Sequence, residues 1–132
     1  MISKNMKTFM MVASLMMALT IAIGAFGAHG LKSYLDEYST DIYQKAVSYQ
    51  FYNTLGLFFI SFVSYLLPTS TKIKKAFYFV LIGTLIFSFS LYTLALTKIM
   101  WLGAITPIGG TLMIIGWILC AYSISKEIKV SN

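Results

Sequence analysis

The sequence alternates between long uncharged stretches and short segments that carry its charged residues. Residues 8–31, 46–71, 76–97 and 99–125 contain no Asp, Glu, Lys or Arg. A helix needs about 20 residues to cross a hydrocarbon core about 30 Å thick, because it rises about 1.5 Å per residue. Each stretch is therefore long enough to span a bilayer. We predict an all-α membrane protein, a single integral domain over residues 1–132 with four transmembrane helices at about residues 8–31, 46–67, 76–97 and 100–125.

The first connection, residues 32–45, mixes charged residues with tyrosines and other apolar side chains. Ser39 or Thr40 could cap a helix whose apolar positions recur every three or four residues. We expect a short interfacial helix that leads into the second span. Its aromatic rings are expected at the level of the lipid headgroups, as is typical of membrane interfaces. These rings belong to Tyr34, Tyr38 and Tyr43.

Lysine placement predicts the orientation of the spans. Seven lysines flank one side, in the N-terminal arm, the second connection and the tail: Lys4, Lys7, Lys72, Lys74, Lys75, Lys126 and Lys129. The other side carries Lys32, Lys45 and Lys98. Because cytoplasmic segments carry an excess of positive charge, we expect both termini in the cytoplasm and a multi-pass protein of the cell membrane. An alternative reading of residues 1–27 as a cleaved secretory signal is less favoured, because the apolar stretch exceeds a usual signal core.

Composition agrees with a membrane protein and excludes several other classes. Hydrophobic residues make up 58% of the chain and charged residues 11%, with a net charge of +6 and a mean hydropathy of +0.80. All ten basic residues are lysine. Bidentate arginine contacts to phosphate are thus unavailable, so we expect membrane lipids as partners and no nucleic acid. The single Cys120 excludes an intrachain disulfide and is interpreted as a small apolar core residue.

Polar residues inside the spans follow helical spacing. One stripe lies on the second span, at Gln50, Asn53, Thr54, Leu57, Ser61 and Ser64, and another on the third, at Thr84, Ser88 and Tyr92. Polar groups at membrane depth persist only when they are paired or face water or a ligand. We therefore expect both stripes to face the interior of the bundle.

Small residues predict close contacts between helices. In the first span, Ser14, Ala18, Ala22, Ala25 and His29 share one face, and Gly24, Gly27 and Gly30 lie roughly opposite. The fourth span starts either at Thr106, with Pro107 in its first turn, or near Met100, with Pro107 kinking it. The glycines that we assign to helix packing are Gly24, Gly27, Gly109, Gly110 and Gly116, and they could also mediate a homo-oligomer.

With this orientation, four distant segments deliver polar residues to the outer third of the bundle. The candidate ligand-binding residues are His29, Gln50, Asn53, Ser88, Tyr92 and Thr106. The cluster is interpreted first as structural hydrogen bonding between helices. A pocket for a lipid headgroup or small molecule is the alternative. A remote third hypothesis is a membrane enzyme in which His29 acts as a base, with Tyr92 or Thr106 as its partner.

Catalytic and metal signatures are missing from the sequence. It contains no HExxH, GxSxG, P-loop or paired-carboxylate pattern, and no predicted span contains Asp or Glu. Proton-coupled exchange generally uses an intramembrane carboxylate, so that mode of transport is not expected. The clustered methionines of the first span are interpreted as packing or lipid-facing residues rather than a copper path. We expect no enzymatic activity, no cofactor and no metal.

Short motifs spread over nearly the whole chain resemble a known family. They are GAFGAH at 24–29, YQ and YNTL at 49–50 and 52–55, FSFSLY and LAL at 87–92 and 94–96, TPIGG at 106–110, and GW at 116–117. In this order they resemble the YgdD/YwdK-like family of small bacterial inner-membrane proteins, also known as domain of unknown function 423. Its animal relatives are called transmembrane protein 256. The resemblance implies a four-span fold and a cell-membrane location, and it implies no particular activity.

Two positions depart from the pattern of that family. The family usually has histidine where this chain has Asn53, and glycine where this chain has Phe89. Loss of the second histidine weakens any paired-histidine mechanism, whether metal binding or acid-base chemistry, that the resemblance could otherwise suggest.

Overall fold

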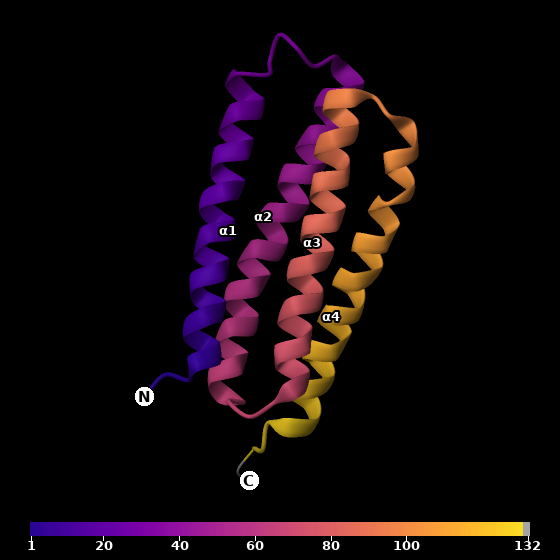
Figure 1. Cartoon of the computed structure of the whole chain (residues 1–132). Helices are drawn as coiled ribbons and strands as arrows, with labels where there is room; N and C mark the ends of the chain where they lie inside the picture. The colour runs from indigo at the N-terminus through magenta and orange to yellow at the C-terminus, as the bar shows by residue number, and fades with distance from the viewer. Residues whose placement is uncertain (131–132) are drawn as a thin grey trace.

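A computed structural model describes residues 1–130, which form four long helices that run up and down side by side (Figure 1). Residues 131 and 132 of the predicted domain lie outside the described part. Both termini and the turn between α2 and α3 lie at one end, here called the terminus end; residues 30–36 and 98–105 connect the helices at the far end (Figure 1). The helices are α1 (Lys4–His29), α2 (Glu37–Leu66), α3 (Thr71–Thr97) and α4 (Thr106–Glu127), and a 3-10 helix, η1 (Met100–Ala104), precedes α4.

The segment before the second span is part of a long helix. α2 is continuous from Glu37, so residues 37–45 are its first turns. The sequence had suggested a separate short helix here. The N-cap of α2 is Asp36, whose carboxylate accepts the backbone N–H of Ser39 at 2.8 Å; the expectation of a Ser39 or Thr40 cap was wrong. Charged residues mark where a helix leaves hydrocarbon, but they do not end it, since lysine and acids are good helix formers or caps.

The start of α4 follows the first of the two predicted alternatives. α4 begins at Thr106 with Pro107 in its first turn, where a missing N–H costs nothing. The residues before it form η1 and not an α-helix, so no α-helix is kinked at the proline. α3 ends at Thr97. Its C-cap, Lys98, adopts a left-handed conformation (φ 57°) and donates its N–H to the carbonyl of Leu94 at 2.8 Å.

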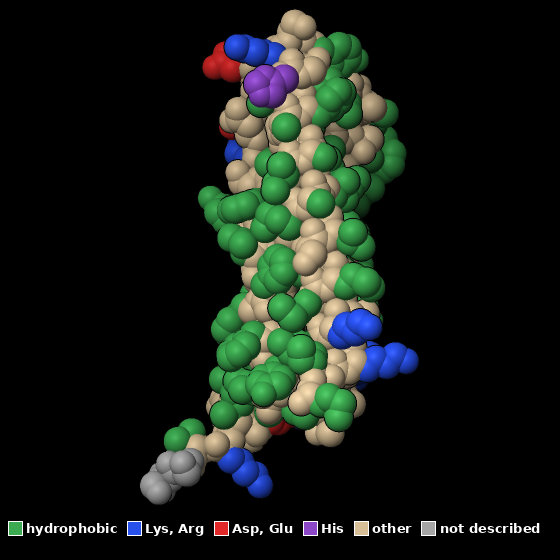
Figure 2. Space-filling view, turned by 90° about the vertical axis from the view of Figure 1, so that its left-hand side faces the viewer, with side chains coloured by type: hydrophobic (Ala, Val, Ile, Leu, Met, Phe, Trp, Pro, Cys, Tyr) green, Lys and Arg blue, Asp and Glu red, His purple; other side chains and the backbone are tan. Residues whose placement is uncertain are grey.

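Among residues 1–130, three helical segments are long and apolar enough to cross a membrane: Lys4–His29, Thr71–Thr97 and Met100–Glu127. α2 is 30 residues long but more polar, because its buried face carries the predicted stripe. One face of the molecule shows hydrophobic side chains along its length, with charged side chains gathered towards the two ends (Figure 2). This distribution is that of a membrane protein.

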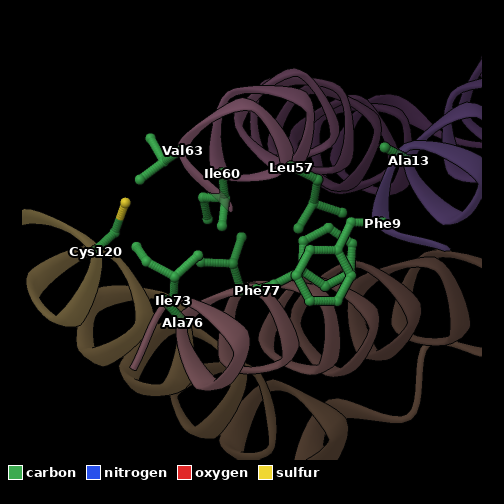
Figure 3. Packing of buried hydrophobic residues seen from close by; sticks show 10 residues of the cluster. Phe9, Ala13, Leu57, Ile60, Val63, Ile73, Ala76, Phe77 and Cys120 are labelled. Atoms are coloured by element: carbon green, nitrogen blue, oxygen red, sulfur yellow. The ribbon is translucent and has the colours of Figure 1, made fainter. Parts of the chain in front are cut away.

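The core has two hydrophobic clusters. Near the terminus end, Phe9 of α1 stacks on Phe77 of α3 with ring centroids 3.9 Å apart, beside Leu57 and Ile60 of α2 (Figure 3). Cys120 is buried in the same cluster, as expected for a small apolar core residue. The cluster near the far end contains Ile42, Tyr43, Ala46, Tyr92, Leu94 and Ala95.

α3 and α4 approach each other through glycine. A methyl group built on Gly109 would lie 2.4 Å from the backbone nitrogen of Phe87 and 2.6 Å from the carbonyl oxygen of Gly83. At Gly116 it would meet the backbone of α3 at 3.0 Å. These distances leave no room for a side chain, which supports the predicted packing role of both glycines. Gly110 differs, because a methyl group there would touch only the Phe87 ring at 3.7 Å, an ordinary contact.

Candidate functional site

The predicted polar residues of α2 and α3 meet inside the bundle. All six residues of the α2 stripe and all three of the α3 stripe are buried, as expected. The hydroxyl of Tyr92 donates a 2.7 Å hydrogen bond to Oε1 of Gln50, which joins α3 to α2. One turn away, the hydroxyl of Ser88 donates to the carbonyl oxygen of Ala46 at 2.8 Å. Two of the candidate site residues, Gln50 and Tyr92, are thus direct partners.

α4 is attached by two further side-chain hydrogen bonds. The indole N–H of Trp117 donates to Oδ1 of Asn53 at 3.0 Å, so the amide of α2 reaches across to α4. At the start of α4, the hydroxyls of Thr106 and Ser90 lie 2.8 Å apart and share a hydrogen bond. Asn53 and Thr106 therefore use different partners. The candidate residues form a belt of pairwise bonds between helices, and we call this set the interhelical belt: Gln50–Tyr92, Ser88–Ala46, Asn53–Trp117 and Thr106–Ser90.

α1 joins α2 through Tyr43. Its side chain is 5% exposed, and its hydroxyl donates to the carbonyl oxygen of Ile23 at 2.7 Å. Its expected place at headgroup level stays a prediction. Gly27 makes the contact of Tyr43 with α1 possible, because a methyl group there would lie 2.1 Å from the Tyr43 ring. Gly24 leaves just enough room for Val47, at 3.3 Å. The two glycines thus form the face of α1 that packs against α2, as predicted.

His29 stands apart from the interhelical belt. It is exposed at the end of α1, and Figure 2 shows the histidine on the molecular surface. The face that it shares with Ser14, Ala18, Ala22 and Ala25 is exposed along its whole length, so the prediction that this small face contacts other helices was wrong. The physical reason is that the glycine face already supplies the contact with α2. Among residues 1–130, no three His, Cys, Asp or Glu side chains lie close enough to hold a metal ion.

The sequence analysis missed four residues at contacts between helices: Trp117, Tyr43, Gly56 and Ser90. Trp117 and Tyr43 were overlooked because an aromatic residue in an apolar helix usually reads as lipid-facing or interfacial. Gly56 leaves space for the Trp117 ring, because a methyl group there would lie 2.2 Å from it. The glycine alone does not indicate this contact in the sequence. Ser90 lies two residues from Ser88, so helical spacing put it on another face. That face is the one that α4 covers.

Most other polar side chains of the spans bond within their own helix. Ser61, Thr84 and Thr20 donate to backbone carbonyls four residues earlier, at 2.6 Å each. Such bonds satisfy a hydroxyl without any partner helix. Within the described part of the chain, the buried side-chain atoms that lack a partner are Ser39 Oγ, Gln50 Nε2 and Thr54 Oγ1.

Ion pairs close both ends of the bundle. At the far end, Lys98 donates to Asp36, which ties the end of α3 to the start of α2. The hydrogen bond from Lys98, followed by that from the Ser39 backbone N–H, lowers the pKa of Asp36 to about 2. At the terminus end, Lys72 of α3 lies 2.9 Å from Glu127 of α4. Asp36 and Glu127 therefore fix helix ends.

The helices, their apolar outer surfaces and the buried interhelical belt define an all-helical membrane protein. A family model described as "Protein of unknown function (DUF423)" matches residues 23–110. The chain belongs to this family, which confirms the resemblance found in its motifs.

Relatives of similar length are described as UPF0382 membrane proteins. The chain is 44% identical over 121 residues to a UPF0382 membrane protein of Staphylococcus haemolyticus, covering 92% of this chain and 98% of the relative. It is 43% identical to one of Staphylococcus epidermidis with the same coverage. The UPF0382 membrane protein YwdK of Bacillus subtilis is 36% identical over 121 residues, again covering 92% and 98%. No solved structure gives a significant match.

Proposed function

We propose that this chain is a non-enzymatic, four-span protein of the cell membrane with both termini in the cytoplasm, a structural or accessory bundle. The observation that carries the proposal is the use of the candidate residues: Gln50, Asn53, Ser88, Tyr92 and Thr106 all bond to neighbouring helices. A site for a ligand built from the same residues would need these groups free. Their pairing favours structural hydrogen bonding.

The energetics point the same way. An unpaired polar group in hydrocarbon costs several kcal/mol, whereas a hydrogen bond between membrane helices contributes about 0.6 kcal/mol on average. Pairing therefore mainly avoids a penalty, and it selects one arrangement of helices over others that would leave the groups unpaired. His29, the base of the catalytic hypothesis, is exposed and absent from these pairs. This makes an enzyme the least supported of the three hypotheses.

The four-span topology rests on α2. At 30 residues it extends about 45 Å, enough to cross a bilayer. It runs beside α1 and α3, which are apolar enough to span (Figure 1). Its polar stripe is buried and bonds to α3 and α4. Its outward side chains include Phe51, Leu55, Phe59 and Phe62, which suit contact with lipid.

Cysteine labelling tests this topology. Single cysteines at Lys32, Lys74 and Lys129 are introduced in a Cys120→Ala background and treated with a membrane-impermeant maleimide in intact cells. We expect labelling at position 32 alone, with positions 74 and 129 labelled only after the membrane is opened. Positions 32 and 74 flank α2, so labelling of both from one side would show that α2 does not cross. Labelling of 129 from outside would reverse the orientation.

A double-mutant cycle tests the structural role of the belt. Tyr92→Phe removes the donor to Gln50 and leaves its amide oxygen buried without a partner, so we expect a loss of about 1–2 kcal/mol in unfolding free energy. Gln50→Leu combined with Tyr92→Phe should recover much of that loss, because neither partner remains polar. Unfolding in mixed detergent micelles measures each variant.

Thr93→Val is the matched control for that cycle. The Thr93 hydroxyl is exposed and bonds only to the carbonyl of Phe89 in its own helix, so its removal should change stability by less than about 0.5 kcal/mol. Additive losses in the cycle, with no recovery in the double variant, would contradict a structural pairing of Gln50 with Tyr92.

A further inference from the structure

A groove runs between α1 and α2 near the far end. Its upper part has a volume of about 270 Å³ and is bounded by Gly24, Gly27 and Ala28 on α1 and by Leu35 in the connection. A second hollow of about 340 Å³ continues it towards the middle of the bundle. The two hollows share Gly24, Val47 and Ser48, so they lie next to each other along the contact between α1 and α2.

The wall that α2 contributes to the upper part is polar. Thr40, Gln44 and Ser48 follow each other at four-residue intervals and all line this part. We call them the polar ladder. Within the described residues, none of the three side chains makes a hydrogen bond to the protein, although most other serines and threonines of the helices bond back to their own backbone. The ladder thus offers free donors and acceptors beside a hollow.

The lower part of the groove is apolar. Its outward rim is formed by Ile21 on α1 and Phe51 and Tyr52 on α2, all of them exposed. Thr20 also lines it, but its hydroxyl is engaged with the carbonyl of Met16 at 2.6 Å. Polarity therefore falls along the groove, from hydrogen-bonding groups at the helix ends to hydrocarbon surface nearer the middle.

We propose that this groove binds one membrane phospholipid, with its glycerol and ester oxygens on the polar ladder and one acyl chain over Ile21 and Phe51. A phospholipid has the same order of chemistry along its length: oxygen-rich at the interface and hydrocarbon below. Thr40, Gln44 and Ser48 are uncharged donors, which suits ester carbonyls that only accept.

The depth of the ladder matches this occupant. The groove ends beside Ala28 and Leu35, at the end of α1, where the chain leaves its uncharged stretch. A lipid in the groove would therefore have its esters at the level of the bilayer interface. A helix from a second copy fits less well, because it would place apolar side chains against three unpaired polar groups. Assignment to the outer leaflet rests on the proposed orientation, whereas binding requires only that α1 and α2 lie in the bilayer.

Native mass spectrometry of the full chain, purified in mild detergent with added palmitoyl-oleoyl phosphatidylglycerol or phosphatidylethanolamine, tests the site. We expect one retained phospholipid per chain. The variant Thr40→Val, Gln44→Met, Ser48→Ala keeps the shape of the wall and removes its hydrogen bonds. It should lower the retained fraction at least about fivefold, the effect of losing one hydrogen bond of about 1 kcal/mol.

The matched control removes three hydroxyls from exposed helix positions that bond to their own backbone: Ser14→Ala, Thr93→Val and Thr111→Val. It should retain lipid like the wild type. Ile21→Trp fills the apolar half without touching the ladder and should also reduce retention of lipid. This second variant tests the site even if the ladder variant folds poorly. Equal retention by the wild type, a folded ladder variant and Ile21→Trp would overturn the proposal.

Photocrosslinking locates the lipid. A phospholipid with a diazirine halfway along one acyl chain should modify mainly Ile21, Phe51 and Tyr52. Modification spread evenly over α1, α3 and α4 would mean bulk annular lipid and would overturn the site. Crosslinked dimers formed in native membranes through Ser48→Cys in a Cys120→Ala background would instead assign the groove to a second copy. Neither result depends on which side the termini occupy, so failure here is separable from failure of the proposed topology.

Discussion

Replacing Gly109 with alanine is expected to lower the unfolding free energy by about 1–3 kcal/mol, the usual cost of forcing atoms into a packed interface. The added methyl group would lie 2.4 Å from the Phe87 nitrogen and 2.6 Å from the Gly83 oxygen. Both are backbone atoms, so no side chain can turn away, and α3 and α4 would have to separate. Loss of that contact matters in a bilayer, where close packing of backbones is a main source of helix association.

Gly110→Ala is the control, one residue away in the same helix. Its methyl group would touch only the Phe87 ring, at 3.7 Å. Alanine favours a helix by about 1 kcal/mol over glycine, so Gly110→Ala should be neutral or stabilising. Both variants gain the same helix propensity, and their difference reports the α3–α4 contact alone. Unfolding in mixed detergent micelles measures it, and equal stability of the two variants would show that α3 and α4 are not in close backbone contact.

Gly109 and Gly110 also show which part of the helix packing was predictable from the sequence and which was not. Glycine spacing correctly indicated close approach in α4, because small residues on a membrane helix usually serve that purpose. It could not separate Gly109 from Gly110, since the partner surface decides which face is used. Gly83 was missed for the same reason: it lies alone in α3, and only the position of α4 explains it.

The orientation of polar residues was predictable from the sequence where an outward position would place them in hydrocarbon. Gln50 and Tyr92 lie in uncharged stretches that we expect to cross the bilayer, so each was expected to face the interior, and the two are partners. His29 lies at the end of its helix, where water and headgroups can solvate either face, and its position was therefore not determined. The ligand-binding role of the candidate set stays a prediction, and the geometry assigns its buried members to pairs between helices.

Apolar residues were the least predictable. In a soluble protein, burial separates apolar from polar positions, but in a bilayer the outer surface is as hydrophobic as the core. Phe9, Met10 and Met11 are adjacent in sequence and similar in hydropathy. Phe9 is 1% exposed, whereas Met10 and Met11 are 40% and 56% exposed. Periodicity within α1 does not reveal which of them faces α3.

Phe9→Ala is expected to produce the second large loss, about 2 kcal/mol of unfolding free energy. Phe9 stacks on Phe77, with ring centroids 3.9 Å apart (Figure 3). It also meets the Tyr78 ring edge-on, with centroids 5.8 Å apart. Truncation of a buried phenylalanine costs about 3–5 kcal/mol in water-soluble proteins. The expected loss is smaller here, because lipid chains solvate the exposed ring almost as well as the core does, and only packing and ring contacts are lost.

Met10→Ala removes a neighbouring side chain that faces outward, so it should change stability by less than about 0.5 kcal/mol. The contrast isolates the role of Phe9 as the contact of α1 with α3 near the terminus end, since the bond from Tyr43 to Ile23 holds α1 only to α2 nearer the far end. If both variants unfold like the wild type, the Phe9–Phe77 stack does not hold α1. Loosening confined to Phe9→Ala, seen as faster proteolysis at the N-terminal arm, would show that α1 needs attachment at both ends.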